Sequence, residues 1–287
     1  MALMMIGISR VRPTAAACLL LVGAHAATAA EDVSRWDGDA RSAARLIAGS
    51  QATGGTASLR AGIEIRLKPG WHTYWRYPGD AGVPPQFDFK TSQNVKTVEV
   101  LWPAPERLPE AGGISIIGYA HDVILPLRIL PQDRAKAVVL RLKLDYAICE
   151  KLCVPAEAKA ELALQSGPAS QDASLAAAEA RVPKKLALGE GGALSIRSVR
   201  REDGPVRPRV WVDVAAPIGI PVDLLAEGPT PQWALPLPTT VDGAPAGLQR
   251  FVFGLDGAPP GAKYQGAVIT LTAVTPGNSI EVATRLD

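Results

Sequence analysis

The chain has 287 residues, 47% of them hydrophobic, and a formal net charge of +2. A chain of this length can bury two hydrophobic cores of ordinary size. Charges so nearly balanced give no electrostatic argument for binding nucleic acid or an anionic membrane surface.

The first thirty residues have the order of a secretory signal peptide. Arg10 and Arg12 form a basic region, residues 15–24 are apolar, and small residues follow at 27–30. The apolar run is shorter than the ~20 residues that a spanning helix needs. We therefore expect residues 1–30 to be removed on export, leaving a mature chain without a membrane span.

The mature chain favours short strands over long helices. Its sequence is rich in residues that interrupt helices, because the whole chain carries 25 prolines and 27 glycines. Short runs with alternating or continuous apolar residues predict strands. These runs are 59–67, 95–100, 123–130, 138–146, 158–164, 194–199, 210–214, 222–226, 249–253, 268–273 and 280–284.

The spacing of the predicted strands indicates an all-β chain of two β-sandwich domains. Between them, residues 172–181 consist mostly of good helix formers and are followed by Pro183. We expect a first domain at 31–166, a linker with a short helix at 167–189, and a second domain at 190–287.

An aromatic cluster begins at Trp71 and continues through His72, Tyr74 and Trp75. Histidine apart, residues 71–77 contain the four aromatic residues Trp71, Tyr74, Trp75 and Tyr77, which is dense for a chain with 5% Phe, Trp and Tyr. The simplest interpretation is packing in a core or turn. The alternative is a partly exposed aromatic rim beside a reactive loop.

Only two cysteines remain after residue 30, and they are Cys149 and Cys153. Such a short loop gains little stability from a bridge, which favours a redox pair over a structural disulfide. Neither alternative is excluded by the residues, and a metal site also stays open. However, a zinc site needs three or four protein ligands. The histidines that could add to the two cysteines, His72 and His121, are far apart in sequence.

Several ordered motifs resemble the periplasmic N-terminal domain of the thiol–disulfide reductase DsbD, and more closely its ScsB (suppressor of copper sensitivity) type. The motifs are Gly70-Trp71-His72-Thr73-Tyr74-Trp75, residues 100–105, Gly118-Tyr119 before residues 123–127, and Tyr146 through Lys159. The last of them contains Cys153-Val154-Pro155-Ala156-Glu157-Ala158-Lys159, which follows the C-x-P-x-E-x-K pattern of the family.

The resemblance implies an immunoglobulin-like sandwich whose cysteines shuttle two electrons. It implies that Cys153 forms the mixed disulfide with a partner and that Cys149 resolves it. The family shields its cysteines with an aromatic cap, and Ile116 stands near that position here, with Tyr119 as a substitute. The expected partner-contacting residues are Trp71, His72, Tyr74, Trp75, Ile116, Tyr119, Tyr146 and Pro155.

The implied function is thiol–disulfide exchange in the periplasm, within a protein-disulfide reductase system that serves cytochrome c maturation, disulfide repair or copper and oxidative stress defence. The expected partners are thioredoxin-like periplasmic proteins and a separate membrane thiol–disulfide reductase. We expect neither a cofactor nor a metal. The alternatives are an immunoglobulin-like binding or scaffold module with a structural disulfide, and a protein that binds copper through its thiolates.

Overall fold

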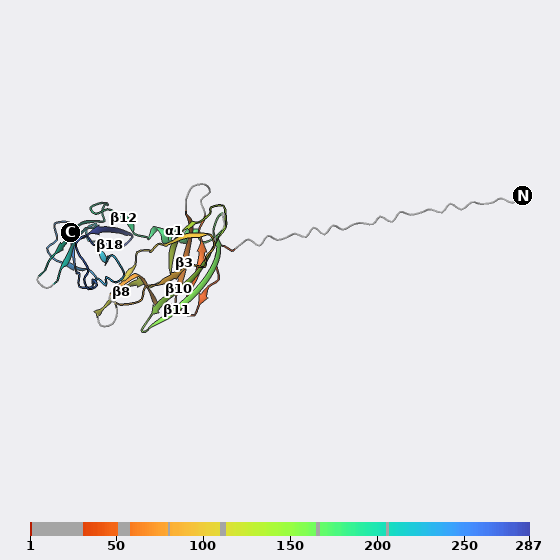
Figure 1. Ribbon diagram of the computed structural model, residues 1–287, viewed down its shortest axis with the longest axis horizontal. Helices are drawn as coiled ribbons and strands as arrows, with labels where there is room; N and C mark the ends of the chain where they lie inside the picture. The colour runs from red at the N-terminus through yellow and green to blue at the C-terminus, as the bar shows by residue number, and fades with distance from the viewer. Residues whose placement is uncertain (2–30, 51–57, 80, 110–112, 165–166, 205–206) are drawn as a thin grey trace. The chain divides into compact units, whose positions relative to one another are not determined.

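The structure is a computed structural model that describes residues 1, 31–50, 58–79, 81–109, 113–164, 167–204 and 207–287. The expected signal peptide, apart from Met1, lies outside the described residues. The chain divides into two units, Met1–Ala30 and Glu31–Asp287, and the second unit is the one described below. Its described part contains two β-sandwiches and one helix, which confirms the predicted all-β class (Figure 1).

Two sheets form the first sandwich. Sheet A has the strand order β1-β2-β3-β9-β6 and contains β1 (Asp37–Gly38), β2 (Ser42–Ala48), β3 (Leu59–Leu67), β6 (Val95–Val100) and β9 (Val123–Pro131). Sheet B has the order β11-β10-β4-β8-β7, with β5 paired to β10. It contains β4 (His72–Gly79), β5 (Gln86–Asp88), β7 (Glu106–Pro109), β8 (Ser115–Tyr119), β10 (Val138–Cys149) and β11 (Cys153–Leu164).

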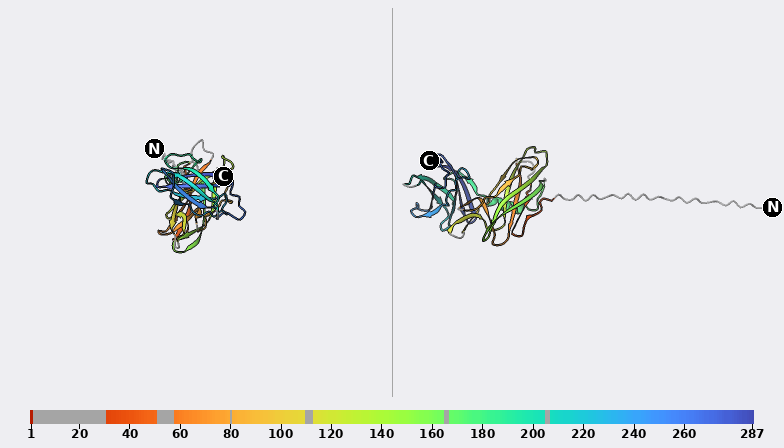
Figure 2. Two further views of the ribbon diagram at one scale, coloured as in Figure 1. Left: turned by 90° about the vertical axis from the view of Figure 1, so that its left-hand side faces the viewer. Right: turned by 60° about the horizontal axis from the view of Figure 1, so that its bottom comes forward.

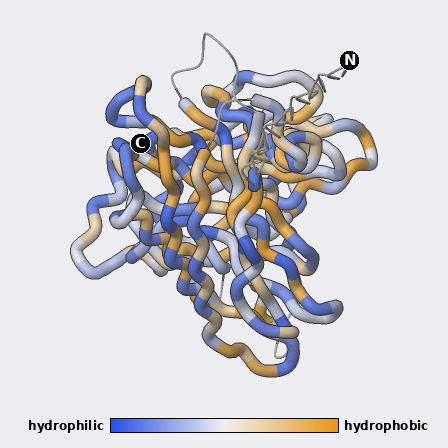
Figure 3. Tube along the Cα trace, turned by 90° about the vertical axis from the view of Figure 1, so that its right-hand side faces the viewer, coloured by the Kyte–Doolittle hydropathy of each residue, from blue (hydrophilic) through white to orange (hydrophobic). Residues whose placement is uncertain are grey.

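The first core lies between sheets A and B and follows from the alternation of side chains along each strand. In β10, every second residue from Val138 to Ile148 is buried in this core, and the residues between them face the other side of the sheet. Figure 3 shows the resulting mixture of hydrophobic and hydrophilic residues along the strands. Consequently, the odd-numbered residues of β10, including Cys149, lie on the outer face of sheet B.

Two further sheets form the second sandwich, whose strands are coloured cyan to blue in Figure 2. Sheet C has the order β12-β19-β18-β15 and contains β12 (Lys184–Leu186), β15 (Asp223–Glu227), β18 (Val268–Thr275) and β19 (Asn278–Arg285). Sheet D has the order β13-β14-β17-β16 and contains β13 (Ser195–Glu202), β14 (Arg209–Ala215), β16 (Thr239–Val241) and β17 (Leu248–Gly254). A separate apolar core fills this sandwich.

The helix of the connecting segment, α1 (Asp172–Ala180), packs against the first sandwich. Its Leu175 is fully buried and lies close to Gly49 and Gly62, where a side chain would collide with the leucine. Arg60 of β3 forms ion pairs with helix residues, including Glu179 at 2.8 Å. This helix is neither long enough nor apolar enough to span a membrane. It is the only α-helix among the described residues.

A side chain of strand β4 in the first sandwich forms ion pairs with the second sandwich. Its pairing with β8 is interrupted between Tyr74 and Gly79. In this interval, the Arg76 guanidinium reaches Glu227 of β15 at 2.6 Å and also pairs with Glu281 of β19. Ion pairs with the second sandwich therefore help to fix the position of β4, the strand whose His72 is paired opposite Cys149.

Candidate redox site

The two cysteines form a disulfide at the end of the β10–β11 hairpin. The strands are paired along their whole length, and Cys149 opposite Cys153 is the pair nearest the turn. Directly opposed residues of an antiparallel pair have Cα atoms roughly 4.5–5.5 Å apart, and here the two Cα atoms are 4.1 Å apart. The hairpin register thus brings the sulfurs within bonding reach without a long loop.

The two cysteines differ in their exposure to solvent. Cys149 is 3% exposed, whereas Cys153 is exposed on β11, which is the edge strand of sheet B. A thiolate from another protein can therefore reach Cys153, while Cys149 is covered. This asymmetry corresponds to the two roles of a redox pair, in which one sulfur meets the partner and the other closes or opens the bridge.

A tyrosine hydroxyl contacts both sulfurs. The Tyr74 hydroxyl oxygen lies 2.8 Å from the Cys149 Sγ and 3.1 Å from the Cys153 Sγ. A disulfide has no proton to give, so the hydroxyl is the donor. Tyr74, Ile116, Ala147 and Cys149 form a small buried cluster that is separate from the main core. The cluster holds the buried Tyr74 against the sulfurs.

The ring of Tyr74 is covered by the chain at Gly82. A Cβ atom on this glycine would lie 2.4 to 2.9 Å from three ring carbons of Tyr74, and the residue has a φ of +120°. Both the close approach and the backbone angle require glycine here. The segment around Gly82 therefore covers the donor, a feature that the cysteine motif alone did not indicate.

Charged residues continue along the outer face of the hairpin beyond the disulfide. Asp145 lies opposite Glu157, and Lys143 lies opposite Lys159. These like-charged pairs are compensated by ion pairs along and between the strands, such as Lys143 with Asp145 at 3.0 Å and Lys159 with Glu157 at 2.9 Å. The hydrogen bond from Lys159, with further help from Lys143, lowers the pKa of the Glu157 carboxyl below its ordinary value.

Residues 43–165 match the family described as the N-terminal domain of the thiol:disulfide interchange protein DsbD. The match covers less than half of the chain and lies in the first sandwich. Both cysteines and Tyr74 lie within the matched residues.

The fold is similar to the crystal structure of the N-terminal periplasmic domain of ScsB from Proteus mirabilis. The TM-score is 0.66 at 21% sequence identity, and the match covers 90% of this chain and 99% of that chain. A share of this size extends well beyond residues 43–165, so the likeness of fold includes the second sandwich. No curated protein matches the chain.

The first sandwich places the predicted contact residues in two different environments. Tyr74 and Ile116 lie in the cluster with Cys149, and His72 is paired opposite Cys149 with its ring edge-on to Tyr74 at 5.8 Å between centroids. Pro155 is exposed on β11, opposite Ala147. These four residues are brought together around the disulfide.

The remaining aromatic residues belong to or pack on the main core. Trp75 is fully buried there, and Trp71 packs on its margin. The Tyr119 hydroxyl donates to the Pro103 carbonyl oxygen at 2.8 Å, and burial raises the pKa of Tyr119 well above its ordinary value. The Tyr146 hydroxyl is hydrogen-bonded with Ser42. Tyr119 thus has no place in the cluster that covers the sulfurs.

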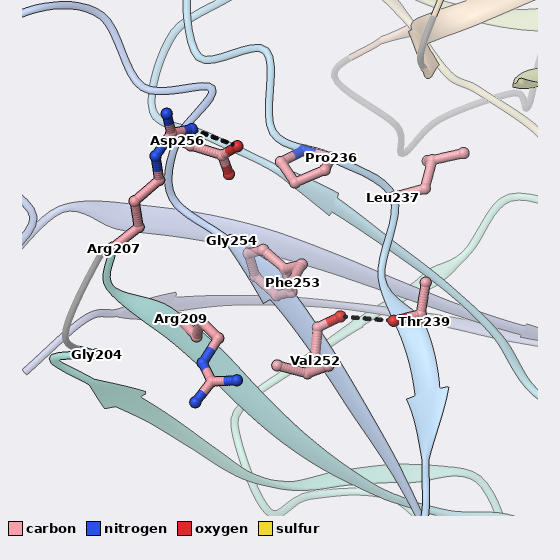
Figure 4. Close-up of a pocket in the computed structure, with 10 residues that line it drawn as sticks. All are labelled: Gly204, Arg207, Arg209, Pro236, Leu237, Thr239, Val252, Phe253, Gly254 and Asp256. Atoms are coloured by element: carbon pink, nitrogen blue, oxygen red, sulfur yellow. Dashed lines mark hydrogen bonds and ion pairs between the residues drawn. The ribbon is translucent and has the colours of Figure 1, made fainter.

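A pocket in the second sandwich is a further candidate site, and Figure 4 shows its lining. Arg207 is paired with Asp256 at 2.9 Å, and Arg209, Thr239 and Val252 line the same pocket. Its lining contains no cysteine or histidine. No group of three or more potential metal ligands occurs in the described part of the chain. The disulfide is therefore the site on which a chemical function can be argued.

Proposed function

We propose that the chain is a periplasmic thiol–disulfide exchange protein that carries electrons between thioredoxin-like proteins through Cys149 and Cys153. The observation that carries this proposal is an exposed Cys153 bonded to a covered Cys149 within residues that match the DsbD N-terminal family. Of the predicted contact residues, His72, Tyr74, Ile116 and Pro155 surround the pair and are the ones we retain for the partner or its approach.

Electrons leave the reduced protein in two steps. The Cys153 thiolate attacks one sulfur of a partner disulfide, which forms a mixed disulfide and releases the other partner sulfur as a thiolate. The Cys149 thiolate then attacks the Cys153 Sγ, which closes the intramolecular bridge and releases the first partner sulfur as a thiolate. The partner gains two electrons, its thiolates take up protons from water, and the chain returns to its disulfide form.

Reduction runs the same steps backwards. A donor thiolate attacks the exposed Cys153 Sγ, and Cys149 leaves as a thiolate within reach of the Tyr74 hydroxyl. Hydrogen bonds to ionised acceptors are stronger than those to neutral ones, so this donor stabilises the leaving sulfur more than the disulfide. Tyr74 is accordingly the residue that we assign to assist bridge opening.

A carrier must stay folded in both redox states, and the hairpin meets this requirement. The bridge closes a loop of only five residues, for which the chain-entropy relation gives a stabilisation of roughly 2 kcal/mol. Twelve opposed residue pairs and a core-facing row of side chains hold β10 and β11 together without it. Opening the bridge should therefore leave the first sandwich intact.

The proposed periplasmic setting is supported by the expected signal peptide at residues 1–30 and by the periplasmic location of the similar ScsB domain. We propose that a separate membrane reductase or thioredoxin-like donor reduces the pair. The electrons would serve cytochrome c maturation, disulfide repair or copper and oxidative stress defence. We also propose domain limits near 31–166 and 190–287, with residues 167–189 as the connector.

Trapping of the mixed disulfide tests the proposal. In Cys149→Ala, the exposed Cys153 should capture partner proteins from periplasmic extract as adducts that dithiothreitol releases. The matched variant Cys153→Ala should capture far fewer, because its remaining thiol is covered. Absence of adducts with Cys149→Ala, together with a wild-type bridge that does not exchange with glutathione, would leave a structural disulfide as the explanation.

A further inference from the structure

The turn between the cysteines carries an exposed leucine. Glu150, Lys151 and Leu152 connect the two strands, and Leu152 is 79% exposed. Single exposed leucines are common on protein surfaces and need no explanation by themselves. Leu152 is of interest because it directly precedes Cys153, the cysteine that a partner must reach.

The geometry of a mixed disulfide places Leu152 inside any interface with a protein partner. Consecutive Cα atoms are about 3.8 Å apart, and the Cα atoms of bridged cysteines are about 4.4–6.8 Å apart. The Cα of Leu152 would therefore lie within about 11 Å of the Cα of the partner cysteine. Even a small interface of roughly 600 Å² per partner extends about 14 Å from its centre, so it includes this residue.

The surroundings of Leu152 divide into an apolar end and a charged remainder. Next to the disulfide, Pro155 is exposed on the outer face of the hairpin, whereas the opposite residue Ala147 is buried in the cluster with Tyr74. The row after that is Asp145 and Glu157, whose carboxylates are already paired with lysines. At the disulfide end of the hairpin, apolar contact is thus available from Leu152 and Pro155, with charged residues beyond them, which is the usual arrangement of a protein interface.

We propose that Leu152 is a specificity-determining residue for the exchange reaction. It packs against an apolar surface beside the redox cysteine of a protein partner and so favours protein disulfides over small ones. This inference rests on the proposed exchange function. A glutathione disulfide offers no such surface, so its reaction with Cys153 gains nothing from the leucine.

The test compares two oxidants of the reduced full-length protein: a thioredoxin in its disulfide form and glutathione disulfide. Leu152→Ser should slow the second-order reaction with thioredoxin about five- to tenfold, as expected for loss of an apolar interface contact. The same variant should react with glutathione disulfide at the wild-type rate. Leu152→Met should retain most of the thioredoxin rate, because it keeps an apolar side chain of similar volume.

Ile218→Ser is the matched control, since Ile218 is fully exposed in the second sandwich and should change neither rate. Equal thioredoxin rates for Leu152→Ser and wild type would overturn the inference, and so would an equal loss with both oxidants or a wild type that does not prefer thioredoxin. If wild type reacts with neither oxidant, the proposed exchange function itself fails, which is a different result.

Discussion

Removal of a single hydroxyl at Tyr74 should slow the opening of the disulfide. Tyr74→Phe keeps the ring in its cluster with Ile116 and Cys149 but removes the donor that lies 2.8 Å from the Cys149 Sγ. A hydrogen bond to a charged group contributes about 1.5–3 kcal/mol. If roughly half of the charge has developed on the leaving sulfur in the transition state, the variant should be reduced about three- to tenfold more slowly.

The assay is the second-order rate of reduction of the oxidised protein by glutathione, followed by quenching and alkylation of the freed thiols. Tyr146→Phe is the matched control, because its hydroxyl is hydrogen-bonded with Ser42 and not with sulfur. This control should be reduced at the wild-type rate. A Tyr74→Phe protein that is reduced as fast as wild type would refute the role of the hydroxyl.

Three further predictions concern stability. Gly82→Val should lower the free energy of unfolding by about 2 kcal/mol or more, because its side chain meets the covered ring and its φ of +120° disfavours L residues. Arg76→Met should lower it by about 3 kcal/mol, since Glu227 and Glu281 lose their shared cation. Wild type should lose stability above about pH 10, the ordinary pKa of tyrosine. Burial raises the pKa of Tyr119 in the folded state, so above about pH 10 the phenol ionises more readily in the unfolded chain, and the free energy of unfolding falls as the pH rises towards the folded pKa.

Urea unfolding measures the free energy of unfolding for all three predictions, and each prediction has its own control. Gly219→Val also places an L residue at a positive φ, of +77°, but has open space around its Cβ, so an equal loss there would contradict the close approach at Gly82. Arg128→Met breaks only an exposed pair at 4.0 Å and should cost under about 0.5 kcal/mol. Tyr119→Phe should lose less stability than wild type above pH 10, and identical pH profiles would argue against the buried phenol.

Sequence patterns predicted the hairpin but not its full length. The alternation of apolar residues indicated strands at 138–146 and 158–164, whereas β10 ends at Cys149 and β11 begins at Cys153. The hairpin ends were missed because Ala147 and Cys149 pack in a second cluster on the outer face, and Pro155 interrupts the strand pattern. The cysteines therefore lie inside the ladder and not in a loose loop.

Strand β4 was predicted only as an aromatic cluster because both of its faces are buried. Trp75 points into the main core, while Tyr74 packs with the sulfurs on the opposite face, so no alternation of apolar and polar residues marks the strand. The same cause hid β2 and β8, whose residues are almost all buried. Once β4 is known to be a strand, its period of two separates Tyr74 and His72 from Trp75.

The contact between Gly82 and the Tyr74 ring had no signal in a single sequence, since it depends on the conformation of the chain just after β4. The ion pairs between β4 and the second sandwich had no signal in the sequence either, because Glu227 and Glu281 are more than 150 residues away from Arg76 along the chain. Long-range contacts of this kind follow from the packed fold and not from local patterns.

The reduction potential of the Cys149–Cys153 pair, measured by equilibrium with glutathione redox buffers, tests the exchange function most directly. Structural disulfides of secreted proteins have potentials below about −300 mV, while bridges that exchange lie higher. The proposed function predicts a value above this limit, with the protein folded in both states. A bridge that stays oxidised in strongly reducing buffer, with a potential below about −300 mV, would contradict it.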